Sequence, residues 1–228
     1  FVERQCIFNT VAPMLDEAYL AAGIPADPSV HQRPQSDYYV RQGTDADGLL
    51  AELATEALRR AYVAGFYSHR LWAAPGTFSR AAIDWMTEPF ASAAALRAGF
   101  AIYETAFGNR PTSELPLLFA PNPTETLILY GPEDHVVLPS FVPRCEVAFP
   151  NHVGPFLVPG AGHFLQWERA DILNGALAGA DAYFSRYPGV EAEIVAKVAL
   201  MLAPGSSGLT GGNGLVALVG AAGGVGVS

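Results

Sequence analysis

Cysteine is scarce in this chain of 228 residues, with only Cys6 and Cys145 present. Neither belongs to a Cys-x-x-Cys or Cys-x-x-His pattern, so the sequence speaks against a structural zinc site, and no metal or other cofactor is expected. We interpret the two cysteines as reduced, buried thiols of a cytoplasmic protein.

Charged residues are also few, at 15% of the chain, and their balance is acidic, with a formal net charge of −9. Nucleic-acid binding needs clustered Lys and Arg to displace counterions from phosphates, so no nucleic-acid partner is expected. Half of the residues are hydrophobic, which excludes a disordered composition. A chain of this length can form one or two domains with a sizeable core.

Long uninterrupted apolar segments are lacking as well. Apolar residues are frequent in the tail, but glycines break them between residues 205 and 228, so no membrane span is expected. The first residues do not form a signal peptide, because the charged Glu3 and Arg4 follow at once. Phe1 is not a methionine and falls at an expected strand, so we expect the chain to be part of a longer protein.

The first half of the chain has a helical pattern. Apolar residues recur at i, i+3 and i+4 spacing through residues 46–67, and Ser79 or Thr77 can cap a helix that starts near Arg80. Proline, serine and glutamine predict a loop over residues 25–36. The expected helices are 14–24, 46–67, one that begins near 80, and 92–107, which ends at Gly108.

Short apolar runs predict strands at residues 2–9, 126–130 and 154–159. The second run, Thr-Leu-Ile-Leu-Tyr, is continuous, which is typical of a strand buried on both faces of a parallel sheet. A loop is expected between the last two strands, and a helix after them over residues 169–187. The alternation of strands and helices predicts the α/β fold class.

Ionisable residues follow two of these strands, in Gly131-Pro132-Glu133-Asp134-His135 and in Gly160-Ala161-Gly162-His163. Catalytic groups of open α/β sheets collect beyond the carboxyl ends of the strands. An acid and a histidine at neighbouring strand ends can form the base of a catalytic triad, because a carboxylate holds the imidazole in one tautomer. We therefore predict Asp134 and His163 as catalytic residues. Glu133 is the alternative acid, and a catalytic role for His135 is less favoured.

The stretches TLILYGPEDHVVLP and FLVPGAGHFLQWERAD resemble the end of the α/β-hydrolase fold. In that family the catalytic residues follow the order nucleophile, acid, histidine, and Asp134 and His163 match the acid and the histidine. Glu168 matches a glutamate that commonly follows the histidine in the family. The resemblance implies a partial α/β-hydrolase fold with a helical cap, in which the N-terminal strands and the nucleophile elbow are missing. The implied segments are 1–13 as the end of the sixth strand, 14–110 as the cap, 111–187 as the last core segment, and 188–228 as a Gly-rich tail.

The expected cap is similar to that of epoxide hydrolases, in which two tyrosines hydrogen-bond the epoxide oxygen. The segment Asp37-Tyr38-Tyr39-Val40-Arg41 matches the first position and LRAGFAIYETAFG the second. The resemblance implies Tyr38, with Tyr39 as its alternative, and Tyr103 as substrate-binding residues. The implied substrate is a small apolar epoxide, opened through an ester that a His163-activated water hydrolyses.

Other interpretations stay open at this point. A serine nucleophile would give an esterase or C–C bond hydrolase, and a dehalogenase of the same fold is a further alternative. The chain could also be a non-catalytic truncated fragment or a helical interaction module of unrelated fold. Residues 219–226 resemble the Gly-rich turn of short-chain dehydrogenases, although low complexity explains that match better.

Overall fold

A computed structural model describes residues 2–33, 36–68, 74–111, 113, 119–177 and 216–219, of which residues 175–177 and 216–219 are described by their backbone alone. The described residues divide into two compact units. The sheet unit contains residues 2–26, 119–177 and 216–219, and the helical unit contains residues 27–33, 36–68, 74–111 and 113.

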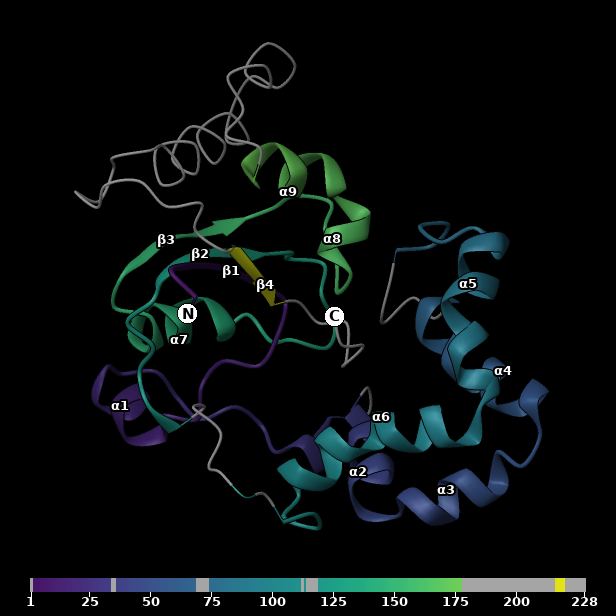
Figure 1. Cartoon of the computed structure of the whole chain (residues 1–228). Helices are drawn as coiled ribbons and strands as arrows, with labels where there is room; N and C mark the ends of the chain where they lie inside the picture. The colour runs from purple at the N-terminus through teal and green to yellow at the C-terminus, as the bar shows by residue number, and fades with distance from the viewer. Residues whose placement is uncertain are drawn as a thin grey trace. The chain divides into compact units, whose positions relative to one another are not determined.

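Four parallel strands form the sheet, in the order β3-β2-β1-β4 (Figure 1). They are β1 (Arg4–Phe8), β2 (Glu125–Tyr130), β3 (His152–Leu157) and β4 (Val216–Val219). The predicted α/β class with a parallel sheet is confirmed. The third strand begins and ends two residues before the predicted 154–159.

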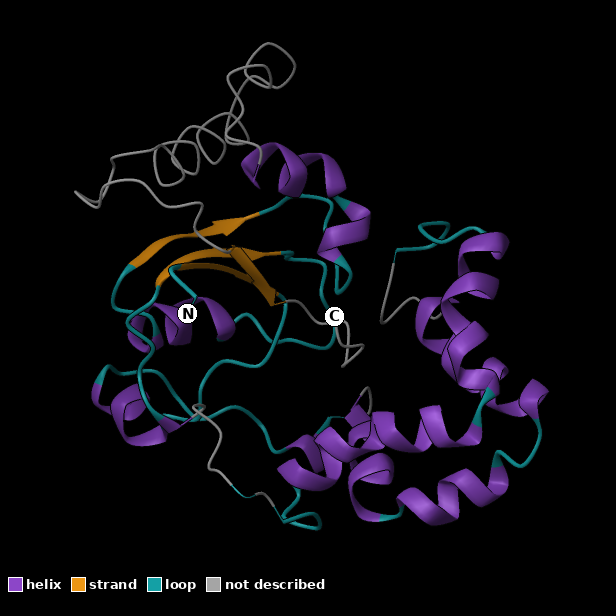
Figure 2. Cartoon of the chain, viewed as in Figure 1, coloured by secondary structure: helices purple, strands orange, loops and turns teal. Residues whose placement is uncertain are grey.

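Both faces of the sheet are covered by helices, because side chains of β1 and β2 alternate between two apolar clusters. Cys6, Phe8, Leu127 and Leu129 belong to a cluster with residues of α8 (Leu165–Glu168) and α9 (Ala170–Leu177). The intervening Ile7, Ile128 and Tyr130 pack with α7 (Phe141–Ala148) instead. Figure 2 shows these helices on opposite sides of the strands. Burial on both faces explains the continuous apolar run of β2.

The helix α7 corrects the expectation of a plain loop between the second and third strands. Pro143 lies in its first turn, where a proline removes no helical hydrogen bond, although the same residue argues against a helix when the sequence alone is read. The segment from β2 to β3 is therefore a strand–helix–strand crossover, which parallel strands require.

The first helix, α1 (Asp16–Ala21), belongs to the sheet unit, whereas the expected cap begins at residue 14. Arg144 of α7 lies over the ring of Tyr19, 5.0 Å from its centroid, and donates to the carbonyl of Pro25. These contacts fasten α1 and the segment after it to α7.

The helical unit contains the short η1 (Val30–Gln32), within the predicted loop 25–36, and η3 (Glu88–Ala91). Its longer helices are α2 (Asp37–Thr44), α3 (Ala46–Glu52), α4 (Glu56–Ser68), α5 (Arg80–Thr87) and α6 (Ala93–Ala106). They enclose a core of Ala46, Leu49, Val63, Leu96 and Phe100. The predicted Ser79 cap of α5 is confirmed, since its hydroxyl accepts from Ala82 N.

The single helix predicted over residues 46–67 is wrong, because α3 ends at Glu52 and α4 starts at Glu56. Arg59 stabilises the break: its guanidinium donates to the carbonyls of Leu53 and Ala54, which follow the end of α3. The same group donates to Ala91 O in η3.

The helix predicted over 169–187 is described only as α9, and residues 178–187 lie outside the described residues, as does most of the tail. Within the described part of the chain, no helix has both the length and the apolar character needed to cross a membrane.

Candidate functional site

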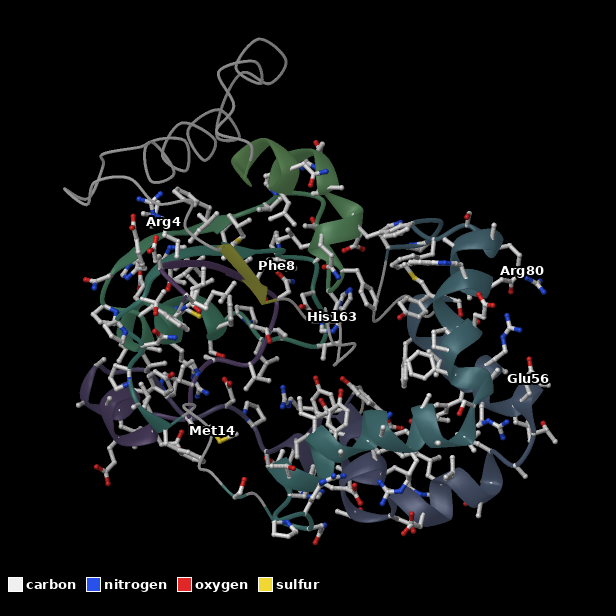
Figure 3. The ribbon with its side chains drawn as sticks, in the orientation of Figure 1. Arg4, Phe8, Met14, Glu56, Arg80 and His163 are labelled. Carbon is white, nitrogen blue, oxygen red and sulfur yellow. The ribbon has the colours of Figure 1, made fainter. Side chains whose placement is uncertain are left out.

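Three segments meet beyond the carboxyl ends of the strands of the sheet unit. They are Asn9 after β1, the acid turn (Gly131–Asp134) after β2, and the histidine turn (Gly160–His163) after β3. Because the strands are parallel, these ends lie at one edge of the sheet, where Figure 3 labels His163.

Asp134 and His163 form a buried hydrogen-bonded pair, with exposed side-chain fractions of 0% and 5%. His163 Nδ1 lies 3.0 Å from Asp134 Oδ2 and 3.2 Å from Oδ1. Asp134 Oδ1 also accepts from the backbone N–H of Val136 at 2.7 Å and of Val137 at 3.0 Å. An ionised carboxylate can only accept hydrogen bonds, so His163 Nδ1 must carry the proton and donate it to Asp134. The basic lone pair of the imidazole is therefore on Nε2. The pair can therefore act as an oriented general base.

Glu133 and His135 are both exposed, unlike their neighbour Asp134. Glu133 turns toward the backbone of the histidine turn, where its carboxylate accepts from Gly160 N at 3.3 Å. The geometry therefore selects Asp134, and neither flanking residue, as the carboxylate that pairs with His163.

Backbone contacts hold the acid turn against the histidine turn. Glu133 N donates to Ala161 O at 3.1 Å, and Val158 N donates to Tyr130 O at 2.8 Å. Gly131 permits this approach, since a Cβ atom there would lie 2.5 Å from Ala161 O. The glycine is therefore needed for the closeness of the two turns.

Glu168 supports the histidine turn from α8. Its Oε2 accepts from Gly162 N at 2.6 Å, directly before His163. The glutamate that the sequence singles out thus binds the backbone of the turn that carries the histidine.

Asn9 is the residue of this site that the sequence did not reveal. It is fully buried and has a φ of 42°, in the left-handed region that asparagine tolerates better than most residues. Its Nδ2 lies 2.8 Å from Asp134 Oδ2 and 2.9 Å from Gly162 O, and its Oδ1 accepts from Gly131 N at 2.8 Å. A signal was present, because a carboxamide directly after the apolar run Cys-Ile-Phe falls at a strand's carboxyl end.

The helical unit brings the predicted Tyr38 of α2 and Tyr103 of α6 together, with ring centroids 5.8 Å apart. Tyr39 joins them, stacked on Tyr103 at 5.2 Å and 4.1 Å from Tyr38. The cause is the close approach of α2 to α6, where Asn109 donates to Gly43 O at 2.9 Å. Both members of the predicted pair, and the alternative Tyr39, therefore belong to one tyrosine cluster.

Burial raises the pKa of Tyr38 strongly, and the neighbouring Tyr39 and Tyr103 add to the effect through their charges and hydrogen bonds. The pKa of Tyr103 is raised by burial as well. The hydroxyls of Tyr38 and Tyr103 therefore stay protonated at neutral pH, as hydrogen-bond donors require.

Cys6 and Cys145 are buried, as predicted, on opposite faces of the sheet. Burial raises the pKa of Cys6 to about 12 and raises that of Cys145 as well, so both stay as unreactive thiols at neutral pH. Among the described residues, no group of three or more His, Cys, Asp or Glu side chains is placed to hold a metal ion.

Comparison with protein-family models, with curated proteins and with solved structures found no match to this chain.

Proposed function

We propose that this chain supplies the acid, the histidine and the cap tyrosines of an α/β-hydrolase that opens small apolar epoxides. The buried Asp134–His163 pair carries the proposal, because its members follow adjacent parallel strands in the order acid, then histidine. That order and placement agree with the resemblance in the sequence.

The proposed reaction has two chemical steps. A carboxylate attacks one epoxide carbon and breaks its C–O bond, while a tyrosine hydroxyl donates its proton to the ring oxygen, which leaves an ester. His163 Nε2 then takes a proton from water, and the resulting hydroxide attacks the ester carbonyl. The ester C–O bond then breaks, and the imidazolium, which Asp134 stabilises, returns its proton to the departing alkoxide to release the diol. The carboxylic acid so formed gives its proton back to the tyrosinate, which restores both the carboxylate and the tyrosine.

The tyrosine cluster favours an epoxide over a carboxylic ester as substrate. An alkoxide that develops from an epoxide needs a proton or a strong donor, and phenols held in the protonated form can provide it. Tyr38 and Tyr103 are two such phenols, and their rings lie side by side with centroids 5.8 Å apart.

The nucleophile is the one group that the proposal does not assign within the 228 residues, since neither G-x-D-x-G nor G-x-S-x-G occurs in them. In the family order the nucleophile precedes the acid and the histidine. The test therefore uses the longest reading frame that contains this chain, with the chain of 228 residues assayed beside it.

The experiment follows styrene oxide turnover and the intact protein mass in the His163→Ala variant. We expect turnover to fall by about 10²–10⁴-fold. We also expect an adduct of the mass of the epoxide to accumulate at one equivalent, because a carboxylate needs no base to attack but its ester needs one to be hydrolysed. His135→Ala, which replaces an exposed histidine of the same region, should leave turnover and mass unchanged.

Two outcomes with the extended protein would contradict the proposal, and one outcome with the chain of 228 residues would extend it. Loss of p-nitrophenyl ester turnover in His163→Ala without any adduct would indicate a serine nucleophile, which needs the histidine in its first step. Absence of turnover of both substrates in the extended protein would indicate a non-catalytic chain. Turnover by the chain of 228 residues alone, abolished by His163→Ala, would place the nucleophile within it.

A further inference from the structure

We propose that Asn9 is a positioning residue that aims the Asp134 carboxylate at His163. Its importance for turnover rests on the proposed function, whereas its effect on the Asp134–His163 pair can be measured without any turnover. Asn9 lies one residue beyond β1, at the meeting point of the acid turn and the histidine turn.

Asn9 continues the pairing of β1 with β2 through its side chain. The last register pair of the two strands is Phe8 with Leu129, and beyond it the Asn9 carboxamide replaces a peptide group. Its Oδ1 accepts from Gly131 N at 2.8 Å, and its Nδ2 makes a longer contact of 3.4 Å with Gly131 O. The φ of 42° turns the backbone of Asn9 out of the strand, so its side chain, in place of its backbone, continues the hydrogen bonds to the chain that follows β2.

The two N–H groups of the carboxamide meet both turns. Nδ2 lies 2.8 Å from Asp134 Oδ2 and 2.9 Å from Gly162 O, the residue before His163. One amide therefore cross-links the acid to the backbone that carries the base. Since Asn9 is fully buried, loss of these partners would leave polar groups unsatisfied, which is costly.

The Asn9 hydrogen bond also fixes the rotation of the carboxylate. Asp134 Oδ1 is held by Val136 N and Val137 N, whereas Oδ2 meets Asn9 Nδ2 and His163 Nδ1. Without Asn9, Oδ2 would be restrained through the imidazole alone. A carboxamide in this place stabilises the ionised carboxylate, and a carboxylate in the same place would repel it.

Several ionisable groups surround the pair. The acid turn region contributes Glu133 and His135, and Tyr130 ends β2, with a pKa raised to about 12 by burial and by Asp134. From the helices that follow, Glu168 binds Gly162 N, and Arg169, paired with Asp171, donates to Pro159 O. The sequence of β4, Val-Ala-Leu-Val, contains no ionisable side chain. A charge introduced at position 9 would lie nearest to Asp134.

The experiment is an NMR titration of the 228-residue chain that follows the Nδ1 proton of His163, assigned by its loss in His163→Ala. Asn9→Gly removes the carboxamide but keeps the left-handed backbone accessible. We expect this variant to fold, as checked by far-UV circular dichroism, and to lose the slowly exchanging Nδ1 signal. An unchanged Nδ1 signal in folded Asn9→Gly would overturn the proposal.

Asn9→Asp serves as the second variant, should Asn9→Gly fail to fold. Two carboxyls at 2.8 Å cannot both ionise readily, so the pKa of the introduced group should be raised. At low pH the protonated group can donate to Asp134 as Asn9 does, and the Nδ1 signal should persist. The Nδ1 signal should disappear as the pH rises through the raised pKa of the introduced carboxyl group. In the unsubstituted chain the signal should persist to a higher pH.

Asn151→Asp is the matched control, because exposed Asn151 also donates a side-chain N–H, to Pro123 O at 2.8 Å, and the substitution adds the same charge. Identical titrations of Asn9→Asp and Asn151→Asp would refute the role of Asn9. Absence of epoxide turnover in the extended protein would refute the proposed function but leave the NMR result standing, so the two failures are distinguishable.

Discussion

At the scale of single residues, the hydrogen-bond donors around Asp134 hold its carboxylate in position for His163. It accepts from Val136 N, Val137 N, Asn9 Nδ2 and His163 Nδ1, so its hydrogen-bonding capacity is almost filled by groups that donate. Glu133, one residue earlier, has no such enclosure and stays exposed. The surrounding hydrogen-bond donors therefore decide that Asp134, and not Glu133, is the partner of His163.

The tyrosine cluster gives a prediction at the same scale, which rests on the proposed function. Tyr38→Phe and Tyr103→Phe should each lower kcat for styrene oxide in the extended protein by about 10²–10³-fold, as the loss of one donor to a developing oxyanion does. Tyr39→Phe should change kcat only a few-fold, because the Tyr39 hydroxyl hydrogen-bonds Tyr38 and so acts on the epoxide through Tyr38.

Steady-state kinetics of the three variants provides the measurement, and the neighbouring position 39 is the control for the packing of the cluster. A large loss in Tyr39→Phe together with normal turnover in Tyr38→Phe would move the donor role to Tyr39. Equal, small effects in all three variants would remove the tyrosines from the reaction.

At the scale of elements, the site depends on how closely two turns approach each other. A Cβ atom on Gly131 would lie 2.5 Å from Ala161 O and 2.8 Å from Gly162 O, both backbone atoms of the histidine turn. Backbone cannot rotate away as a flexible side chain can. The acid turn and the histidine turn therefore keep their separation only with glycine at position 131.

Gly131→Ala should consequently lower the free energy of unfolding by about 1–3 kcal/mol, the range found for overpacking. It should also weaken the slowly exchanging Nδ1 proton signal of His163, since the turns must separate. Gly99→Ala is the control: Gly99 lies within α6 with no atom within 4 Å of a Cβ atom there. That change should increase helix stability by about 0.5–1 kcal/mol.

Urea denaturation followed by circular dichroism measures both variants. An unfolding free energy of Gly131→Ala equal to that of the unsubstituted chain would show that the turns can move apart freely.

The elements also show what a sequence can predict. The strand β2 and the Ser79 cap of α5 are local features, so their residues contain the signal. The break after α3 is not local: the apolar periodicity continues through it, and Arg59 stabilises it from the next helix. The helix α7 was not predicted, because proline breaks a helix when it lies in the interior, and the sequence does not reveal that Pro143 lies in the first turn.

The predicted and the missed residues of the site differ in the same way. Asp134 and His163 follow glycines at the ends of two recognisable strands, so spacing alone places them near each other. Asn9 makes its contacts with residues 122, 125 and 153 positions away, and those partners exist only after the sheet has formed. A polar residue at a strand end is therefore a candidate, but its partners come from the fold.

At the scale of the whole molecule, the scarce thiols are part of the packing of the sheet unit. Cys6 lies in the cluster under α8 and α9, and Cys145 lies in the cluster on the opposite face. Tyr19 and Tyr130 are buried in the same unit. All four groups are acids that burial keeps neutral, which couples the stability of this unit to alkaline pH.

The sign of the coupling follows from the pKa values. Burial raises the pKa of Cys6 from 9.0 to about 12, and those of Tyr19 and Tyr130 from 10.0 to about 12. Groups with a raised pKa in the folded state contribute stability that is fully present below the unfolded value and is lost as pH rises toward the folded value. The free energy of unfolding should therefore fall from pH 9 upward, steepening above pH 10 as the tyrosines of the unfolded chain ionise.

Urea midpoints measured by circular dichroism between pH 7.5 and pH 11 check this expectation, at roughly constant ionic strength. Cys6→Ala should begin at a lower midpoint because it leaves a cavity. Its midpoint should nevertheless fall less steeply between pH 9 and pH 10, because two thiols, Cys6 and Cys145, titrate there in the unfolded chain and the variant keeps only Cys145. A midpoint independent of pH over this range, or equal slopes with and without Cys6, would show that the buried thiol does not control the alkaline limit of the sheet unit.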